Sequence, residues 1–248
     1  MLGAKGGIEM MPGPDQIIAC PKCKGLARYM TLASGNTLDA RVWTDGKMIA
    51  PMFPLPPTVV KCHRCAELYW RTDAEEIGTV DRWRGTSENV NPAWADAPKV
   101  EEPTEEEYYQ ALANGVAKNA KQEKVLRILA WWRRNDAFRD TPLKQAQGIS
   151  NDPEAWRKNL EALARLLIEE DVNDCLIKAE VLRELGKFES AKQVLSRATS
   201  PDGAAVVRQL RSLCDAGDTC VRELHYSPPR ITLAQAFASA LSKIGLRR

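Results

Sequence analysis

Two Cys-x-x-Cys pairs constrain this chain of 248 residues more than any other feature. The first pair is Cys20 with Cys23, and the second is Cys62 with Cys65. Two cysteines separated by two residues on a tight turn can direct both sulfurs at one ion, and a second such turn completes a tetrahedral shell. The four thiolates therefore predict one structural zinc ion with no open position for a substrate.

The residues around the two pairs predict short strands and turns. Pro21 lies inside the first turn and Gly25 follows it. Apolar, strand-like residues lead into both pairs at 17–19 and 58–60, and residues 68–70 lead away from the second pair. This order of turns and strands is typical of a zinc ribbon, which we expect over residues 16–77.

The spacing between the pairs indicates an insertion in the ribbon. Thirty-eight residues lie between Cys23 and Cys62, whereas common spacings are roughly 15–20 residues. The dipeptides Gly35-Asn36 and Asp45-Gly46 predict turns. Residues 40–43 and 47–49 are candidate strands, and the prolines that follow require an extended return: Pro51, Pro54, Pro56 and Pro57.

Other chemistries for the four cysteines are disulfides, a redox-active pair and an iron or iron–sulfur centre. No secretory segment precedes them, so we expect a reducing, cytoplasmic compartment. No alternating strand–helix pattern surrounds the first pair, which argues against a thioredoxin-like site. His63 lies between two ligands and is expected to face solvent. The other cysteines are expected to be free thiols: Cys175, Cys214 and Cys220.

Two segments outside the ribbon are predicted to lack a compact fold. Residues 1–15 carry glycine, proline and little apolar content, so we expect a disordered tail; Met1, Met10 and Met11 are all candidate starts. Residues 78–103 are expected to form an acidic, proline-containing linker. Trp83 and Trp94 interrupt it and are expected to pack onto a neighbouring domain. No apolar run approaches the roughly 18 residues of a membrane span.

From Thr104 the pattern changes to helical, and residues 104–248 are predicted to form an all-helical domain. Thr104 is a candidate N-cap followed by three glutamates, and this helix should end near Asn114-Gly115. A long helix over about 119–138 should bury the stripe Val125, Ile128, Leu129 and Trp132. Trp131 is expected at its boundary, with Arg133 and Arg134 in solvent or paired with acidic residues.

The remaining helices are predicted from caps and apolar stripes. Pro153 opens a helix that should end at residues 169–171, residues 204–214 form another, and a last one spans 231–244. Residues 172–201 resemble a tetratricopeptide repeat (TPR), because Leu185-Gly186-Lys187-Phe188 matches its helix–turn–helix joint. No second copy follows at a 34-residue offset, so we expect one TPR-like hairpin rather than an array.

The order of these features resembles a family. The chain is similar to uncharacterised bacterial zinc-ribbon proteins with TPR-like C-terminal helices. The similarity lies in two cysteine pairs that enclose ASGNT, ARVWTDGK and AP, followed by an acidic linker and a helical part with LAWWRRND. The resemblance spans most of residues 16–226. It implies an α+β fold, with a β-rich zinc ribbon before an all-α TPR-like domain, and it implies no activity.

Two non-enzymatic functions of different classes are favoured, since no catalytic motif appears and a four-cysteine site is saturated. An enzyme of unknown class is a third, less favoured alternative. The first is a protein–protein adaptor that uses the helical domain. The second is a nucleic-acid binder, because residues 16–72 hold eight bases against three acids. Trp43 and Tyr69 would offer stacking. The candidate contacts cluster at the cysteine pairs: Lys22, Lys24, Arg28, Lys61 and Arg64. These bases would also screen the charge of a zinc–thiolate centre.

Overall fold

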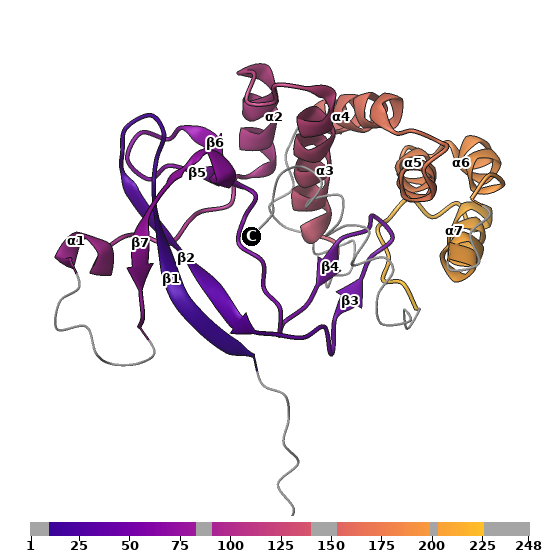
Figure 1. Ribbon diagram of the computed structural model, residues 1–248. Coiled ribbons are helices and arrows are strands. Elements are labelled where there is room, and N and C mark those ends of the chain that lie inside the picture. Colours follow the sequence, from indigo (N-terminus) through magenta and orange to yellow (C-terminus); the bar gives the residue numbers. More distant parts are fainter. Residues whose placement is uncertain (1–9, 83–90, 140–152, 199–202, 226–248) are drawn as a thin grey trace, which may run out of the picture. The chain divides into compact units, whose positions relative to one another are not determined.

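The computed structural model describes residues 10–82, 91–139, 153–198 and 203–225 (Figure 1). Small antiparallel sheets precede a series of helices, so the predicted α+β class is confirmed. The chain divides into two compact units. The ribbon unit comprises Met1–Ala40 and Ile49–Pro103, and the helical unit comprises Arg41–Met48 and Thr104–Arg248. The chain therefore passes between the units three times.

The main sheet of the ribbon unit has β1 (Met11–Ala19) between β2 (Leu26–Ser34) and β7 (Glu75–Val80), all antiparallel (Figure 1). Ile17, Ile18 and Ala19 are almost completely buried, as expected for a central strand. Residues 11–15 belong to β1 and not to the disordered tail that we expected. The part of the predicted tail that precedes residue 10 lies outside the described residues.

A second, smaller sheet pairs β5 (Val59–Lys61) with β6 (Leu68–Trp70), and the short 3-10 helix η1 (Arg71–Asp73) follows. Both strands lie where the apolar runs predicted them. Val60 and Tyr69 are buried together with Cys20 and Cys62, so one cysteine of each pair is part of a small core.

The segment predicted to be a linker is largely integrated in the ribbon unit. β7 ends in it, and α1 (Pro92–Ala95) places Trp94 against Gly78. Further along, the backbone of residues 98–100 pairs with Arg28 of β2, and Glu101 pairs with Lys61 of β5. Trp94 thus packs in cis as predicted, whereas Trp83 lies outside the described residues. The predicted linker was wrong for this part, because acidic side chains do not prevent pairing through backbone groups.

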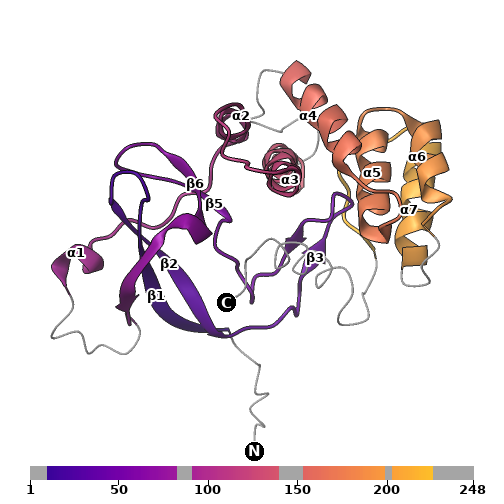
Figure 2. The same cartoon turned by 45° about the horizontal axis from the view of Figure 1, so that its top comes forward.

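The helices of the helical unit agree closely with the predicted ranges. Thr104 forms a capping box with Glu107, and Asn119 caps the long helix. Figure 2 shows the last three helices side by side. The bounds are α2 (Glu105–Ala113), α3 (Ala120–Asp136), α4 (Pro153–Leu166), α5 (Val172–Glu184), α6 (Phe188–Leu195) and α7 (Ala204–Asp215).

The turn between α5 and α6 lies where the sequence predicted it, with Gly186 at φ +73°. That conformation suits glycine because a Cβ atom is unfavourable there. The α4 boundary differs from the prediction, since α4 ends at Leu166 and Asp171 instead caps α5. The helix predicted over 231–244 lies outside the described residues. Among the helices that the structure describes, none is long and apolar enough to cross a membrane.

The hairpin of β3 (Arg41–Val42) and β4 (Met48–Ile49) is the largest difference from the expected domain boundaries. Its turn at Gly46 is as predicted, but residues 41–48 belong to the helical unit and not to the ribbon. Thr44 N donates to the carbonyl oxygen of Arg222 at 2.8 Å, and Leu224 N donates to that of Val42 at 2.7 Å. The hairpin is thus hydrogen-bonded to the chain that follows α7.

The two tryptophans of α3 have the opposite roles to those predicted. Trp131 is completely buried among Leu160, Leu163 and Val181, whereas Trp132 is only partly buried. Successive residues differ by about 100° around a helix, so Trp131 lies in the centre of this cluster whereas Trp132 packs at its margin. Packing of α3 against α4 and α5 selects Trp131.

Candidate metal centre

The two cysteine pairs form two turns with the same hydrogen-bonding pattern. Cys20 N donates to Gly25 O at 2.9 Å, and Cys62 N donates to Glu67 O at 2.9 Å. The amides of Lys24 and Ala66 close the turns onto the first cysteine of each pair, at 3.0 and 2.9 Å. The sequence predicted two such turns, and the structure brings them together from positions about forty residues apart.

Each turn contains a residue with positive φ directly after its second cysteine. The φ angles are +57° for Lys24 and +58° for Ala66. This left-handed conformation costs a residue with a Cβ atom about 1–2 kcal/mol. It occurs at equivalent positions of the two turns, which indicates that it belongs to the turn that orients the sulfurs.

The four sulfur atoms lie within 4.8 Å of one another. The Sγ atoms of Cys20 and Cys65 are 3.8 Å apart, and those of Cys23 and Cys62 are 3.5 Å apart. Zn–S bonds of about 2.3 Å in a tetrahedral site place sulfurs about 3.8 Å apart. The residues present therefore fit a zinc ion, which they would hold with four protein ligands.

The electrostatics of the thiols also suit a cation. A hydrogen bond from Gly25 N, at 3.4 Å, helps to lower the pKa of Cys23 to about 7. The backbone of Glu67 lowers the pKa of Cys65, but burial and the neighbouring thiols outweigh it and raise that pKa to about 12. Burial raises the pKa of Cys20. Four thiolates this close repel one another, and a bound divalent cation would stabilise all four.

His63 points away from the sulfurs. Its Nε2 is 2.7 Å from the carbonyl oxygen of Lys99, and its Nδ1 is 3.7 Å from Glu101. The side chain is partly exposed and contacts the segment that pairs with β5. It therefore does not serve as a fifth ligand.

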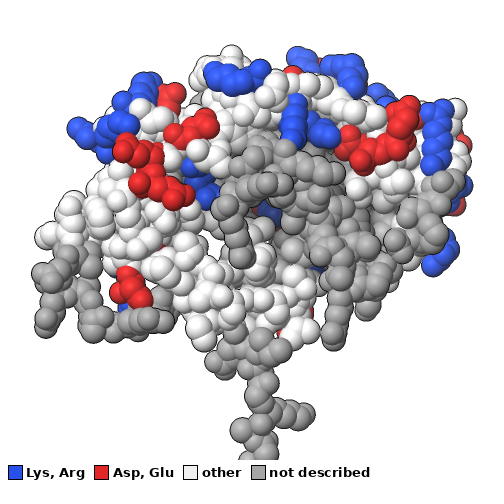
Figure 3. Space-filling model, in the orientation of Figure 1, with Lys and Arg blue, Asp and Glu red and all other residues white. Residues whose placement is uncertain are grey.

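The predicted nucleic-acid contacts are mostly engaged with other groups. Lys22 pairs with Glu67 at 2.5 Å and Lys24 with Glu75 at 3.2 Å. Arg28 is largely buried beside Asp15 at 2.7 Å. Arg64 reaches the carbonyl oxygen of Cys23 at 3.5 Å, and for Lys61 the backbone N–H, rather than the side chain, donates to Glu101 O. On the face drawn in Figure 3, basic side chains alternate with acidic ones.

The two aromatic residues proposed for stacking are buried. Trp43 is 3% exposed and lies in the helical unit, and Tyr69 is 5% exposed beside the cysteines. Neither offers a free ring face for a base in this conformation. Nucleic-acid binding by the five basic residues remains a prediction.

The helical unit contains a buried polar centre that the sequence did not reveal. Asp45, at the tip of the hairpin, is completely buried and forms a two-bond ion pair with Arg139, at 2.6 and 3.1 Å. Asn135 Nδ2 lies 3.0 Å from both Asp45 Oδ2 and Glu184 Oε1. Trp131 Nε1 donates to Glu184 Oε2 at 2.7 Å. We call this set, Asp45, Trp131, Asn135, Arg139 and Glu184, the buried polar centre.

Glu184 is the unusual member of the buried polar centre. Burial raises its pKa well above the ordinary value, and the nearby carboxylates of Glu180 and Asp45 add to this. Glu180 is paired with Arg183 at 2.6 Å, and both of these side chains are completely buried. From the sequence, Asp45-Gly46 predicted only a turn. No local pattern shows that an aspartate in such a turn will be buried.

No family model, curated protein or solved structure matches this chain. The metal centre therefore rests on the geometry of its own four cysteines. The resemblance to bacterial zinc-ribbon proteins with TPR-like helices stays an expectation from the sequence.

Proposed function

We propose that this chain is a non-catalytic zinc-binding protein that acts as a protein–protein interaction adaptor through its helical unit. The observation that carries the proposal is the closed four-sulfur cluster, with all ligand atoms within 4.8 Å. Four protein ligands complete a tetrahedral zinc site and leave no position at which the metal could act on a substrate. The metal then serves to hold the ribbon fold together.

The helical unit supports the adaptor part of the proposal. Its α5–α6 hairpin turns at Gly186, the position at which the sequence resembles a TPR joint. Two large apolar side chains lie exposed near the start of this hairpin, Ile168 at 58% and Val172 at 37%. Exposed apolar side chains that are close in the sequence can offer a contact surface for another protein.

The test is affinity capture from native cell lysate with the zinc-loaded chain, at two salt concentrations and with or without nuclease. We expect a protein partner that survives nuclease and moderate salt. It should be lost when Ile168 and Val172 are both changed to Glu. Leu38→Glu, at a residue of the ribbon unit that is 57% exposed, is the matched control and should retain the partner.

The same experiment tests the nucleic-acid alternative. Phosphate contacts weaken steeply as salt rises, whereas a largely apolar contact responds much less. Bound material that disappears with nuclease or modest salt would contradict the adaptor role. Lys22, Lys24, Lys61 and Arg64 would then be the residues to change.

A further inference from the structure

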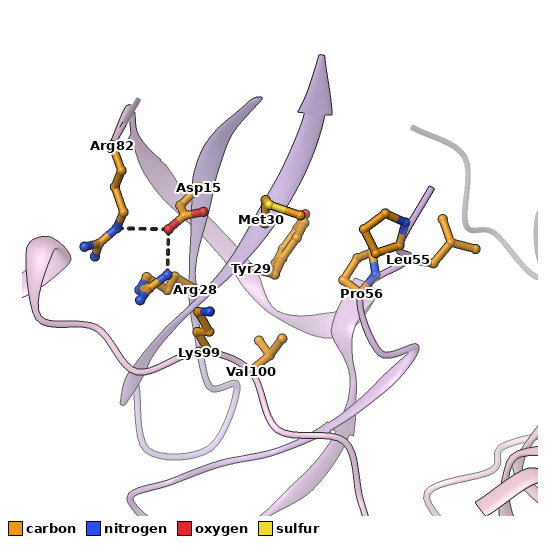
Figure 4. Close-up of a pocket in the computed structure, with 10 residues that line it drawn as sticks. Asp15, Arg28, Tyr29, Met30, Leu55, Pro56, Arg82, Lys99 and Val100 are labelled. Atoms are coloured by element: carbon orange, nitrogen blue, oxygen red, sulfur yellow. Dashed lines mark hydrogen bonds and ion pairs between the residues drawn. The ribbon is translucent and has the colours of Figure 1, made fainter. Parts of the chain in front are cut away.

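A cleft of about 410 Å³ lies in the ribbon unit, away from the cysteines. Clefts of roughly 300–1,000 Å³ are of the size that binds ligands. Figure 4 shows Tyr29 and Met30 of β2 on one side, Leu55 and Pro56 across from them, and Val100 below. These side chains make most of the lining apolar.

One end of the cleft is basic. Arg28 and Arg82 both approach Oδ2 of the buried Asp15, at 2.7 and 3.0 Å (Figure 4). Lys99 lines the same end, and within the described residues its ammonium group has no carboxylate partner. Three cations against one carboxylate leave an excess of two positive charges, which favours an anionic group on the ligand.

The strand beside the cleft has a partly open edge. Arg28 N donates to Pro98 O at 2.8 Å, and Val100 N donates to Arg28 O at 2.8 Å, so the backbone groups of Arg28 point away from β1. The direction alternates along a strand, and Met30 therefore points its N–H and C=O to the same outer side. After Val100 the pairing segment leaves β2 and joins Lys61 of β5 instead.

The opposite wall is poorly suited to pair with this edge, because Leu55 is the only one of its three residues with an N–H. It consists of Pro54, Leu55 and Pro56, and proline has no N–H to donate. Leu55 is 59% exposed there. Within the described part of the chain, no backbone hydrogen bond joins these residues to Met30. The cleft thus combines an open strand edge, an apolar wall and a basic end.

We propose that this cleft binds an extended peptide segment of a partner protein, which adds to the edge of β2 at Met30 and places an acidic side chain beside Lys99. Strand addition supplies main-chain hydrogen bonds, and side-chain pockets supply specificity. Contact with Pro54, Leu55 and Pro56 favours an apolar residue next to the acidic one. The site lies in the ribbon unit, so it does not depend on the adaptor role proposed for the helical unit.

The test uses the full zinc-loaded chain and a random octapeptide library displayed on phage. Selected peptides are synthesised with a fluorescent label, and their affinities are measured by anisotropy. We expect the selected sequences to carry an acidic residue next to an apolar one. Lys99→Glu should weaken their binding at least about tenfold, because it replaces an attractive charge beside the acidic residue with a repulsive one. Lys158→Glu, at an exposed lysine of the helical unit, should leave it unchanged.

Two further changes test the strand edge itself. Met30→Pro removes the outward N–H without touching the pairing of Tyr29 with Gln16 of β1, whereas Met30→Val keeps that N–H. We expect only the proline variant to lose binding. Met30→Pro must retain the circular dichroism of the parent chain. The peptide can also be N-methylated at every second nitrogen, which leaves the protein unchanged. Methylation of the nitrogens that face β2 should abolish binding, whereas methylation of the other set should not.

Several results would overturn the inference. One is a selection that yields no peptide, and another is binding that resists both Met30→Pro and N-methylation. If decanoate competes with the peptides, and neither Met30→Pro nor N-methylation changes peptide binding, the cleft is assigned to a small apolar acid instead. Failure here leaves the Ile168 and Val172 result intact, because those residues lie in the other unit.

Discussion

Both units bury groups that carry charge, but they compensate it in different ways. The ribbon unit gathers four like groups, the thiols of Cys20, Cys23, Cys62 and Cys65, around a point that suits a metal ion. The helical unit instead surrounds the buried carboxylate of Asp45 with Arg139 and Asn135. The first arrangement needs a cation from solution, whereas the second contains its own. The stability of the two units should therefore respond to different perturbations.

Removal of zinc should produce the largest effect. Structural zinc in small domains contributes roughly 10–16 kcal/mol, coupled to folding. A chelator is expected to unfold the ribbon strands while α3 and α5 keep their helicity. Hydrogen exchange measures both: protection should be lost in β1, β5 and β6 and retained in the helices. Cys62→Ser should behave in the same way, and Cys220→Ser is the matched control outside the site. Ribbon strands that remain protected after chelation would refute the metal-dependent fold.

Asp45→Ala should produce the next largest effect, and it should be independent of zinc. The change leaves the guanidinium of Arg139, which is 2% exposed, without its main partner. Breaking a buried pair in this way costs about 3–5 kcal/mol. Urea unfolding of the zinc-loaded chain measures the loss. Glu75→Ala removes an exposed ion pair with Lys24 and should change little. If Asp45→Ala were as mild, the buried polar centre would not hold the hairpin.

The pH dependence of the helical unit gives a smaller effect. The pKa of Glu184 is raised in the folded state, so the folded protein favours its protonated form. Its contribution to stability is complete below the unfolded-state pKa of about 4.3 and is lost as pH rises through the folded-state pKa. Glu184→Gln should flatten this fall in unfolding free energy, which begins as the pH rises above the unfolded-state pKa. A variant with the same pH profile as the parent would show that Glu184 does not titrate in this range.

Ala66→Gly should produce the smallest effect, and it has the opposite sign. Glycine adopts positive φ without a steric penalty, so the change should raise the free energy of unfolding of the zinc-loaded ribbon unit by about 0.5–1 kcal/mol. Ala74→Gly is the control, because Ala74 has an ordinary φ of −76° and should lose stability. Equal effects of the two changes would mean that the turn does not impose the left-handed conformation.

The sequence by itself determined the features that depend on short spacing. The Cys-x-x-Cys turns, the Thr104 capping box and the glycine turn at Gly186 all require particular residues at fixed offsets. The backbone of a few consecutive residues determines each of them. For this reason the four clustered cysteines and most helix boundaries could be predicted from the residues alone.

The tertiary structure decided the features that join distant parts of the chain. Asp45 and Arg139 are 94 residues apart, so no local pattern could show that the hairpin belongs to the helical unit. Likewise, only packing decided that Trp131 and not Trp132 is buried. The pairing of residues 98–101 with β2 and β5 uses backbone atoms that every residue carries. Burial and long-range pairing depend on the whole fold, because the energy of each contact is realised only when both partners are in place.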